Sequence, residues 1–541
     1  NLVGALSGTG LSARAGIGHT RWATHGEPND RNAHPHTDPT GRVAVVHNGI
    51  IENYQALRAS LPDGRFASDT DTEVAAHLVA RELDRMDAPD LFEAVRRVVA
   101  TLEGAYSLCF IATDEPDTIV VAKNEAPLII AHADGVGYCA SDVAALIAHT
   151  RDVAALEDGQ LARITPGGLE VTDDDGNPAE PHEYTVQWDV EAAEKQGYPH
   201  FMLKEIHEQP TAVRETLRDR ITPNGAQQGG GRLHLDELDI DERDLARIDK
   251  VFILACGTSL HSGMVGKLAI EHWAGIPCEV EVASEFRYRD PIVDAHTLVI
   301  AISQSGETSD TIAAASHARD QRAPVIGLCN VVGSTLAREA DGVLYTHAGP
   351  EVGVAATKTF LTQIVGCLLL GLYLAQVRGR MFPSECEDIL DRLQQIPGAI
   401  EEILAQNDEI EELAKRYSDT DYTMFIGRHA GLPIAYEGAL KLKEISYLHA
   451  EAFPAGEMKH GPIALIEEGS LVVALAPEGH VFSKMVSNIQ EVRARGADVI
   501  AVGSAGTTSD LKEHADHVLT LPEASHELAT PVLAVVPLQL F

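Results

Sequence analysis

The chain has 541 residues, which is too many for one hydrophobic core and predicts three or so domains. Its composition, 45% hydrophobic and 23% charged, is that of a globular protein, and its formal net charge of −39 argues against nucleic-acid binding because phosphate backbones are repelled. We expect no membrane-spanning segment, since the apolar runs look shorter than the ~18 residues that such a helix needs.

Residues 1–185 alternate short β-type runs with helical stretches, a pattern that predicts a mixed α+β domain. The β-type runs are Val43–His47, Tyr106–Ile111, Thr118–Val121 and Leu128–Ile130. Residues 186–245 differ in composition and are expected to form a linker. There the glycine-rich segment Gln227–Arg232 predicts a flexible break, and the acidic segment Leu235–Asp249 predicts a solvated linker or a surface helix.

From Lys250 onward the pattern becomes strand, glycine-containing turn and helix, and it occurs twice. Alternation of this kind predicts parallel sheets covered by helices. We therefore expect two copies of one α/β (αβα, parallel-sheet) domain, at residues 246–390 and 391–541. The predicted strands are Val251–Ala255, Thr297–Ile302, Pro324–Cys329, Thr423–Ile426, Leu471–Ala476, Asp498–Val502 and Val518–Leu521.

Two polar turns follow neighbouring strands of the first copy, at Cys256–Ser259 and at Ser303–Thr308. Where a strand meets a helix, hydroxyl groups and free backbone N–H groups gather at the positive end of the helix dipole, which suits a phosphate ester. A single turn of this type is often only a helix N-cap. Two at adjacent strand ends favour a ligand site, and a phosphosugar is favoured over a nucleotide because no P-loop pattern accompanies them.

One helix of the second copy concentrates charged side chains on a single face. Glu437, Lys441 and Glu444 recur at i, i+4 and i+7, and a loop with His460 follows. The alternative is an exposed helix with salt bridges. Only 12 of the 42 basic residues are lysines, and three of them fall between residues 441 and 459. This enrichment favours acid–base chemistry on a sugar.

The segment from His19 to Asn53 gathers polar residues that a plain core does not need. Asn48-Gly49 follows a strand and predicts either a hairpin turn or an oxyanion hole made of an amide side chain and a glycine N–H. Arg21 beside Trp22 predicts a bidentate clamp for a carboxylate under an aromatic lid. Further on, Ser68–Glu73 reads locally as a helix N-cap with early acids.

Metal binding is not expected. His34, His36 and His47 lack a ligand spacing, and the seven cysteines lie far apart without a C-x-x-C pair. Free cysteines are typical of a reducing cytoplasm. The acidic, lysine-poor composition fits either a salt-rich cytoplasm or an ordinary acidic protein from a GC-rich genome.

Five motifs together resemble one family, the glutamine–fructose-6-phosphate aminotransferases (isomerizing), also called glucosamine-6-phosphate synthases. They occur in family order along essentially the whole chain. The motifs are His-Thr-Arg-Trp-Ala-Thr-His-Gly from His19, His-Asn-Gly-Ile-Ile-Glu-Asn from His47, Leu-Ala-Cys-Gly-Thr-Ser from Leu254, Ser-Gln-Ser-Gly-Glu-Thr from Ser303 and Lys-Leu-Lys-Glu-Ile-Ser-Tyr from Lys441.

The resemblance implies an α+β amino-terminal-nucleophile glutaminase domain of αββα type, followed by two sugar isomerase (SIS) domains. It implies that L-glutamine and D-fructose 6-phosphate give D-glucosamine 6-phosphate and L-glutamate, without a metal or other cofactor. It further implies a cytoplasmic homodimer formed through the SIS domains, with ammonia passing through an internal channel.

The family pattern also implies roles for residues of the first domain. Arg21 is implied to anchor the glutamine carboxylate and Asp71 its amino group, while Asn48 and Gly49 form the oxyanion hole. The residues implied to line the glutamine pocket or to gate the ammonia channel are Thr24, His25 and Trp22.

In the SIS domains, Glu444 is implied to be the base that moves a proton between C1 and C2, with Lys441 close by. His460 is implied to help open the sugar ring, from the other subunit of a dimer. The residues implied to contact the sugar or to cradle its phosphate are Thr258, Ser259, Ser303, Gln304, Ser305, Thr308 and Val354.

Two family features are missing from the sequence. The family's nucleophile is a cysteine at the mature amino terminus, but no cysteine precedes Cys109 here. The family's Schiff-base lysine lies in a carboxyl tail beyond Phe541. Because the surrounding pocket residues are in place, we expect truncation at both ends, an inactive fragment and an active complete gene product.

Three other functions are weighed against this one. A sugar-phosphate sensor needs only the phosphate cradle and leaves Glu444, Lys441 and His460 unexplained. A different glutamine amidotransferase needs a phosphoribosyl-type domain after residue 245, which the paired serine-rich turns do not supply. An isomerase that uses free ammonia leaves Arg21, Asn48 and Asp71 without a purpose.

Overall fold

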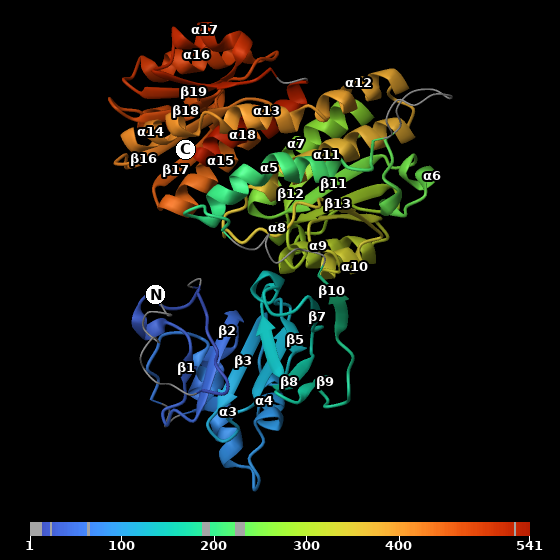
Figure 1. Cartoon of the computed structure of the whole chain (residues 1–541), viewed down its shortest axis with the longest axis vertical. Helices are drawn as coiled ribbons and strands as arrows, with labels where there is room; N and C mark the ends of the chain where they lie inside the picture. Colours follow the sequence, from blue (N-terminus) through green and yellow to red (C-terminus); the bar gives the residue numbers. More distant parts are fainter. Residues whose placement is uncertain (1–12, 22–23, 62–64, 187–194, 222–232, 524–525) are drawn as a thin grey trace. The chain divides into compact units, whose positions relative to one another are not determined.

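The computed structural model describes residues 13–21, 24–61, 65–186, 195–221, 233–523 and 526–541. The chain divides into two compact units, residues 1–190 and 191–541, which are coloured blue to teal and green to red in Figure 1. The predicted flexible break at Gln227–Arg232 lies outside the described residues.

The first unit contains two antiparallel sheets. The six-stranded sheet has the order β1-β2-β3-β4-β8-β9 and the four-stranded sheet the order β10-β7-β5-β6. The bounds are β1 His36–Thr37, β2 Val43–Gly49, β3 Tyr106–Ala112, β4 Ile119–Asn124, β5 Ile129–Ala133, β6 Val136–Ala140, β7 Asp152–Ala155, β8 Leu161–Thr165, β9 Gly168–Thr172 and β10 His182–Thr185. The helices are η1 Asp30–Asn32, α2 Tyr54–Ala59, α3 Glu73–Asp84, α4 Leu91–Val99 and η2 Val143–Ala145.

Both faces of the six-stranded sheet are buried, which explains why its central strands are apolar at nearly every position. On β2, Val43 and Val45 face the core formed with α3 and α4, whereas Val46 faces the core shared with the second sheet. Side chains alternate between the two faces of a strand, so two separate cores can be built from one strand. The α+β class expected for this part of the chain is confirmed.

The second unit contains two parallel sheets with the same topology. Their strand orders are β12-β11-β13-β14-β15 and β17-β16-β18-β19-β20, so in each sheet the first strand along the chain lies second in the sheet. The first sheet consists of β11 Lys250–Ala255, β12 Cys278–Val282, β13 Thr297–Ser303, β14 Val325–Cys329 and β15 Gly342–Tyr345. The second consists of β16 Tyr422–Gly427, β17 His449–Pro454, β18 Leu471–Leu475, β19 Asp498–Ser504 and β20 His517–Leu521. The predicted duplication of an α/β domain is therefore confirmed.

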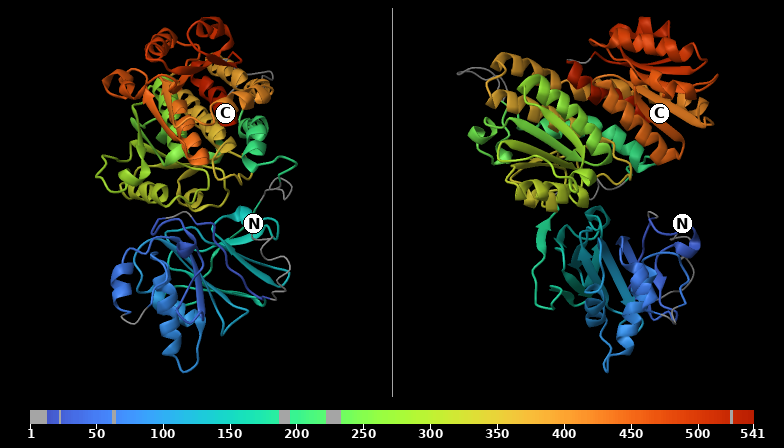
Figure 2. Two further views of the ribbon diagram at one scale, coloured as in Figure 1. Left: turned by 90° about the vertical axis from the view of Figure 1, so that its left-hand side faces the viewer. Right: turned by 180° about the vertical axis from the view of Figure 1, so that it is seen from behind.

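Helices cover both faces of each parallel sheet, as the rear view in Figure 2 shows. Around the first sheet these are α7 Gly257–Ala269, η5 Ile270–Ala274 (a π-helical turn), α8 Ala283–Phe286, α9 Ser309–Asp320, α10 Thr335–Glu339 and α11 Lys358–Val377. Around the second they are α15 Gly431–Ser446, η6 Glu457–His460, η7 Pro462–Leu465, α16 Phe482–Arg493, η8 Ala505–Thr507, α17 Thr508–Lys512, η9 Glu527–Ala529 and α18 Thr530–Leu540. The remaining helices are α5 Phe201–Leu217, η4 Asp236–Leu238, α6 Glu242–Leu245, α12 Pro383–Leu393, α13 Ile396–Leu404 and α14 Asn407–Arg416.

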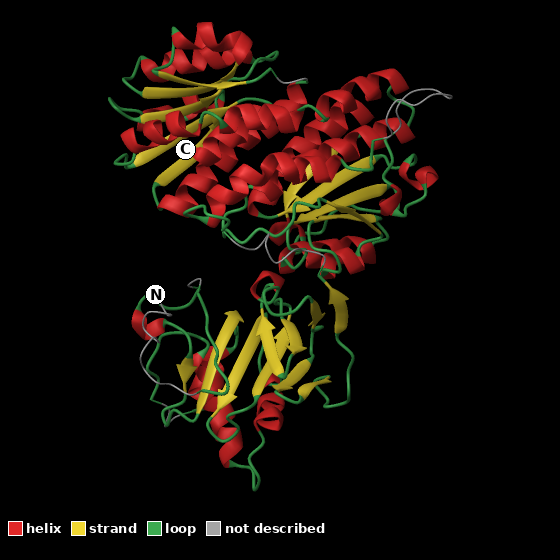
Figure 3. Cartoon of the chain, in the orientation of Figure 1, coloured by secondary structure: helices red, strands yellow, loops and turns green. Residues whose placement is uncertain are grey.

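One hydrophobic core extends from the first parallel sheet to the second. It contains Ile253 and Ile300 from the first sheet, Val473 and Ile500 from the second, and apolar residues of the helices between them. Figure 3 shows these helices in red between the two yellow sheets. Each of α5, α7, α11, α13, α15 and α18 contacts at least two of the others there. Because the two halves share a core, a residue of one half can be held firmly against the other.

The segment predicted to be a linker is largely part of this unit, which corrects that expectation. α5 packs against α11 and α13 and buries Ile206 and Val213. The acidic stretch after residue 233 forms the short helices η4 and α6, whose Leu238 and Leu245 are also in the core. Acidic residues between the leucines stay at the surface, so the composition alone resembles a solvated linker.

The expectation that no helix could cross a membrane was wrong in its premise. α11 has 20 residues with a mean hydropathy of 1.8, enough by length and composition to span one. However, 89% of its apolar window is buried inside the second unit. The helix is hydrophobic on all sides because protein surrounds it on all sides.

Candidate active site

Two polar turns lie at the carboxyl edge of the first parallel sheet, as predicted from the sequence. β11 and β13 are hydrogen-bonded neighbours, and the turns that follow them lead into α7 and α9. The carboxyl ends of parallel strands meet at the same edge, where α/β proteins bind their ligands. The two turns therefore lie side by side at this edge, which we call the first crevice.

The turn after β13 is shaped by its own hydroxyl groups. Ser303 Oγ lies 2.9 Å from Thr308 Oγ1 and accepts a hydrogen bond of 3.0 Å from the Gly306 N–H. Ser305 Oγ accepts from the Glu307 N–H at 3.1 Å. Thr308 is the N-cap of α9, yet its side chain makes no capping bond there. The turn thus does not serve α9 as a side-chain cap, which was the alternative interpretation.

The turn after β11 is tied to the second half of the unit. Thr258 Oγ1 donates to Glu437 Oε1 at 3.1 Å, and Ser259 Oγ accepts from Gln363 Nε2 at 3.0 Å. Glu437 lies on α15 and is completely buried. The first sheet's crevice therefore contains a carboxylate supplied by a helix of the second α/β domain.

The predicted charged face of α15 is present and mostly buried: Glu437 and Lys441 are buried, whereas the Glu444 side chain is 26% exposed. Glu437 also accepts from His261 Nδ1 at 2.7 Å and lies 3.6 Å from Lys441 Nζ. Lys441 in turn donates to Glu444 Oε2 at 2.7 Å, and its side chain is only 5% exposed. Because Glu437 and Lys441 are buried, the alternative of a solvated salt-bridged helix is wrong. Removing one member of a buried charge pair typically costs about 3–5 kcal/mol.

These contacts form one continuous path from the phosphate-type turn to an acid–base pair. It runs from Thr258 through Glu437 and Lys441 to Glu444. Glu437 was placed on this face from the sequence but was given no role, because its partner Thr258 is 179 residues away. Lys443, on the same helix, is exposed and takes no part in the path.

His460 is not brought to this crevice within the chain. It ends η6 and is exposed, and among the described residues it makes no hydrogen bond or ion pair with Lys441 or Glu444. The neighbouring Lys459 instead pairs with Glu491 at 2.7 Å.

Val354 lies in an exposed loop that precedes α11, and its side chain is 88% exposed. The loop is held by Glu205 of α5, whose carboxylate accepts from the N–H groups of Val352 at 2.6 Å and Gly353 at 3.0 Å. Burial raises the pKa of Glu205 to about 7, although the two backbone N–H groups oppose this shift. Sequence reasoning missed Glu205, because its partners Val352 and Gly353 lie about 147 residues further along the chain.

In the first unit, Asn48 and Gly49 are the last residues of β2 and pair with Ser107 and Tyr106 of β3. They form no hairpin turn, so that alternative is wrong. Gly49 has a φ of +135°, and a Cβ there would lie 2.1 Å from the Ala105 carbonyl oxygen. Only glycine fits at this position. A cavity of about 140 Å³ lies beside Asn48 and is also lined by His19, Ser107, Cys109 and Cys139.

Arg21 is held by three backbone carbonyl groups of the segment that follows it. Its guanidinium donates to the carbonyls of His25 at 2.7 Å, Gly26 at 3.1 Å and Glu27 at 3.2 Å. Thr24 is exposed in this segment, and the His25 ring contacts Tyr54 edge-on. Trp22 lies outside the described residues.

Asp71 is buried at the start of α3. Its Oδ2 accepts from the Ile51 N–H at 2.8 Å and lies 3.8 Å from His47 Nδ1. Because Ile51 follows Asn48-Gly49 almost directly, this bond fixes the end of β2 relative to Asp71. Burial lowers the pKa of His47 to about 4 in spite of Asp71, so His47 is neutral at physiological pH.

The segment Ser68–Glu73 differs from the predicted N-cap. α3 begins at Glu73, and its N-cap residue Thr72 makes no side-chain capping bond. Instead the Glu73 carboxylate reaches back to the N–H groups of Ala67 and Ser68, both at 2.6 Å. Burial raises the Glu73 pKa, but hydrogen bonds from His77, Ser68 and the backbone outweigh it and lower the pKa to about 2.

Two domain families match the chain. The SIS domain family matches residues 244–373 and 418–541, and the glutamine amidotransferase domain family matches residues 19–148. The SIS matches contain both parallel sheets, and the other match contains Arg21 and Asn48-Gly49.

Curated relatives are similar over the whole chain. A glutamine–fructose-6-phosphate aminotransferase [isomerizing] of Streptomyces coelicolor is 53% identical in an alignment of 548 positions that covers 100% of this chain and 88% of that protein. One of Mycolicibacterium smegmatis is 50% identical and covers 99% of this chain and 86% of its own length. The solved C-terminal domain of glucosamine-fructose-6-phosphate aminotransferase from Francisella tularensis is 39% identical, with a TM-score of 0.61 over 64% of this chain and 96% of that chain.

Proposed function

Because the chain belongs to the glutamine–fructose-6-phosphate aminotransferase (isomerizing) family, we propose that its two units carry the two halves of one reaction. The enzyme transfers the amide nitrogen of L-glutamine to D-fructose 6-phosphate and isomerises the ketose to an aldose. The products are D-glucosamine 6-phosphate and L-glutamate. The first unit releases ammonia from glutamine, and the second unit adds that ammonia to the sugar.

The observation that carries the proposal for the sugar half is the path from Thr258 to Glu444. Hydroxyl and N–H groups at the starts of α7 and α9 hold the phosphate. Glu444 then acts as the base that moves a proton from C1 to C2, and Lys441 keeps its carboxylate in one orientation. The residues assigned to the sugar and its phosphate are Thr258, Ser259, Ser303, Gln304, Ser305, Thr308 and Val354.

In the first unit, the side-chain amide of Asn48 and the N–H of Gly49 stabilise the oxyanion that forms when the glutamine amide is attacked. Arg21 binds the glutamine α-carboxylate, and Asp71 binds its α-amino group. The rigid end of β2 supports these roles, because Gly49 is fixed against Ala105. The residues assigned to the pocket wall and to the gate for ammonia are Thr24, His25 and Trp22.

The test uses the complete gene product and follows glutamate and glucosamine 6-phosphate separately. We expect equal amounts of the two products when both substrates are present. Glu444→Gln should lower the rate of glucosamine 6-phosphate formation by ~10³-fold and leave glutamine hydrolysis in place. Binding of fructose 6-phosphate without any amino sugar formed by the unaltered enzyme would contradict the proposal and favour a sensor.

We further propose a homodimer formed through the second unit, in which His460 of the partner subunit completes each sugar site. The exposed position of His460, away from Glu444 of its own chain, supports this arrangement. His460→Ala and Glu444→Gln should each be inactive alone, whereas co-expression should restore about a quarter of the activity through one intact site per mixed dimer. No restoration would contradict the shared site.

The reaction's phosphorylated substrate and the seven free cysteines support a cytoplasmic location.

A further inference from the structure

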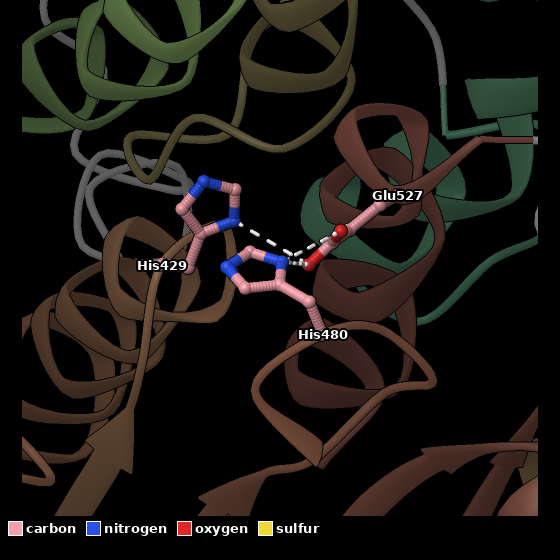
Figure 4. Close-up of side chains that lie close together, drawn as sticks. All are labelled: His429, His480 and Glu527. Atoms are coloured by element: carbon pink, nitrogen blue, oxygen red, sulfur yellow. Dashed lines mark hydrogen bonds and ion pairs between the residues drawn. The ribbon is translucent and has the colours of Figure 1, made fainter. Parts of the chain in front are cut away.

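The carboxyl edge of the second parallel sheet carries two imidazoles and a carboxylate that the proposed reaction does not use. His429 follows β16, His480 follows β18, and Glu527 begins η9. One donor atom from each residue lies within 4.8 Å of the others. Figure 4 shows both rings directed toward the Glu527 carboxylate.

The distances within the cluster are close to those of a metal centre. His480 Nδ1 lies 2.8 Å and 2.9 Å from the two Glu527 oxygens, and His429 Nδ1 lies 3.5 Å from Glu527 Oε1. Ligand atoms around a tetrahedral zinc ion are ~3.3 Å apart, given metal–ligand bonds of about 2.0 Å. All three donor atoms lie within 4.8 Å of one another, so an ion can replace the proton between His480 and Glu527 after side-chain movements of roughly 1 Å.

The backbone around the cluster is shaped to bring these side chains together. His429 has a φ of +49°, the left-handed region that non-glycine residues seldom adopt. A Cβ on Gly479 would lie 2.6 Å from Glu527 Oε1, so glycine there lets the carboxylate approach the β18 loop. Such a conformation costs about 1–3 kcal/mol and persists only where the surrounding structure holds it.

The Nδ1 atom of His429 is shielded from solvent and, within the described residues, lacks a well-directed hydrogen bond. Its distance of 3.5 Å from Glu527 is too long for a good one. A buried nitrogen without a partner is costly, and a metal ion satisfies it. This atom distinguishes the cluster from a simple His480–Glu527 hydrogen bond.

The donor set selects the class of ion. Imidazole nitrogen suits zinc and its transition-metal neighbours, whereas magnesium and calcium prefer sites made of oxygen alone. Two histidines and one glutamate leave a fourth position for a water molecule. His480 is 61% exposed, so an ion can enter from solvent.

We propose that His429, His480 and Glu527 form a binding site for a divalent transition-metal ion of the zinc class. The ion joins the loops after β16 and β18 to the segment before α18. His429 lies just before α15, the helix that carries Lys441 and Glu444, so the ion also fixes the start of that helix. Its main effect is to stabilise the second unit, because an ion that binds only the folded state shifts unfolding to higher temperature.

The experiment strips the protein with a chelator and titrates it with Zn²⁺ against a chromophoric competitor. We expect one Zn²⁺ per chain with a Kd below ~1 µM, and a rise in Tm on binding. Glu527→Gln and His480→Ala should each weaken this binding by at least ~100-fold. His429→Asn is a third variant, chosen because asparagine tolerates the left-handed backbone.

Two controls keep the outcome decisive. His296→Ala removes an exposed histidine outside the cluster, whose Nδ1 lies 3.9 Å from the carboxylate of Asp294. This variant should still bind one Zn²⁺ per chain with unchanged affinity. Co²⁺ should give a visible spectrum of a four- or five-coordinate ion with the unaltered protein and not with Glu527→Gln. Binding that is weak, or equally strong in all three cluster variants when circular dichroism shows them folded, would overturn the proposal.

Discussion

The carboxyl edges of the two parallel sheets differ in chemistry although the sheets share one topology. β16 occupies the place of β11 in its sheet, and β18 occupies the place of β13. After β11 and β13 stand hydroxyl residues, among them Thr258, Ser303 and Thr308. After β16 and β18 stand His429 and His480. The fold provides a crevice at each edge, and the turn residues decide what that crevice can bind.

The two halves also differ in which crevice their helices serve. α15 belongs to the second domain, but its Glu437 bonds to Thr258 of the first. The amino-terminal end of α15, at Gly431, follows His429 almost directly. One helix therefore connects the two edges. The second α/β domain contributes residues of this helix to the site of the first.

The largest expected effect comes from the acid–base pair that α15 brings to the first crevice. Glu444→Gln should lower kcat for glucosamine 6-phosphate formation by ~10³-fold, within the range for loss of a general base. The affinity for fructose 6-phosphate should change little, because the phosphate turns are intact. Lys443→Gln, an exposed change on the same helix, is the matched control and should leave kcat unaltered. An equal loss of kcat in both variants would show that Glu444 has no specific role as the base.

A smaller effect should separate the two edges directly. Ser303→Ala removes a hydroxyl from the first crevice and should weaken fructose 6-phosphate binding ~10–100-fold, as expected for a hydrogen bond to a charged group. His480→Ala changes the equivalent loop of the second sheet and should leave that affinity unchanged. Calorimetric titration with the sugar phosphate measures both. If His480→Ala weakened binding as much, the two edges would not be independent.

The loop at Val352 and Gly353 offers a test by pH. The raised pKa of Glu205, about 7 against an ordinary 4.5, means that the folded state holds a proton that the unfolded state releases earlier. Stability should therefore fall as pH rises from about 4.5 to about 7 and change no further from this group above that. Glu205→Gln should flatten this decline in urea unfolding measured at several pH values. An unchanged slope would show that Glu205 ionises normally.

The smallest effect is expected at Val354. Its side chain is 88% exposed, so Val354→Ala should change the free energy of unfolding by less than about 0.5 kcal/mol. Any rise in KM for fructose 6-phosphate then reports a contact with the sugar and not a loss of packing. A large drop in Tm would show instead that the loop is packed against a surface that the exposure does not reveal.

Local patterns in the sequence were enough for the repeated parallel sheets and for the charged face of α15. The alternation of strand, turn and helix depends only on residues that are close in the sequence. The spacing of Glu437, Lys441 and Glu444 is local in the same way. The burial of that face was not accessible, because it depends on Thr258 and His261 of the other domain. The brace from Glu205 to the loop at Val352 was missed for the same reason, since 147 residues separate the two.

One rejected alternative and one wrong expectation share a physical cause. Asn48-Gly49 has the composition of a hairpin turn, but β2 pairs with β3, a strand that begins only at Tyr106. α11 has the composition of a membrane helix, but it is covered by α5 and α7, which precede it in the chain, and by α18, which follows it. In each instance the environment comes from distant segments, and a local pattern cannot report it.

The burial of α11 has a consequence for synthesis of the chain. α11 ends at Val377, but α18, which contacts it and donates from Gln539 to the Thr357 carbonyl, begins only at Thr530. At ordinary elongation rates roughly 8–30 s separate the two. During that time a helix with the composition of a membrane span has one side uncovered. We expect a chain that stops after Leu521 to bind a hydrophobic dye that the chain ending at Phe541 excludes.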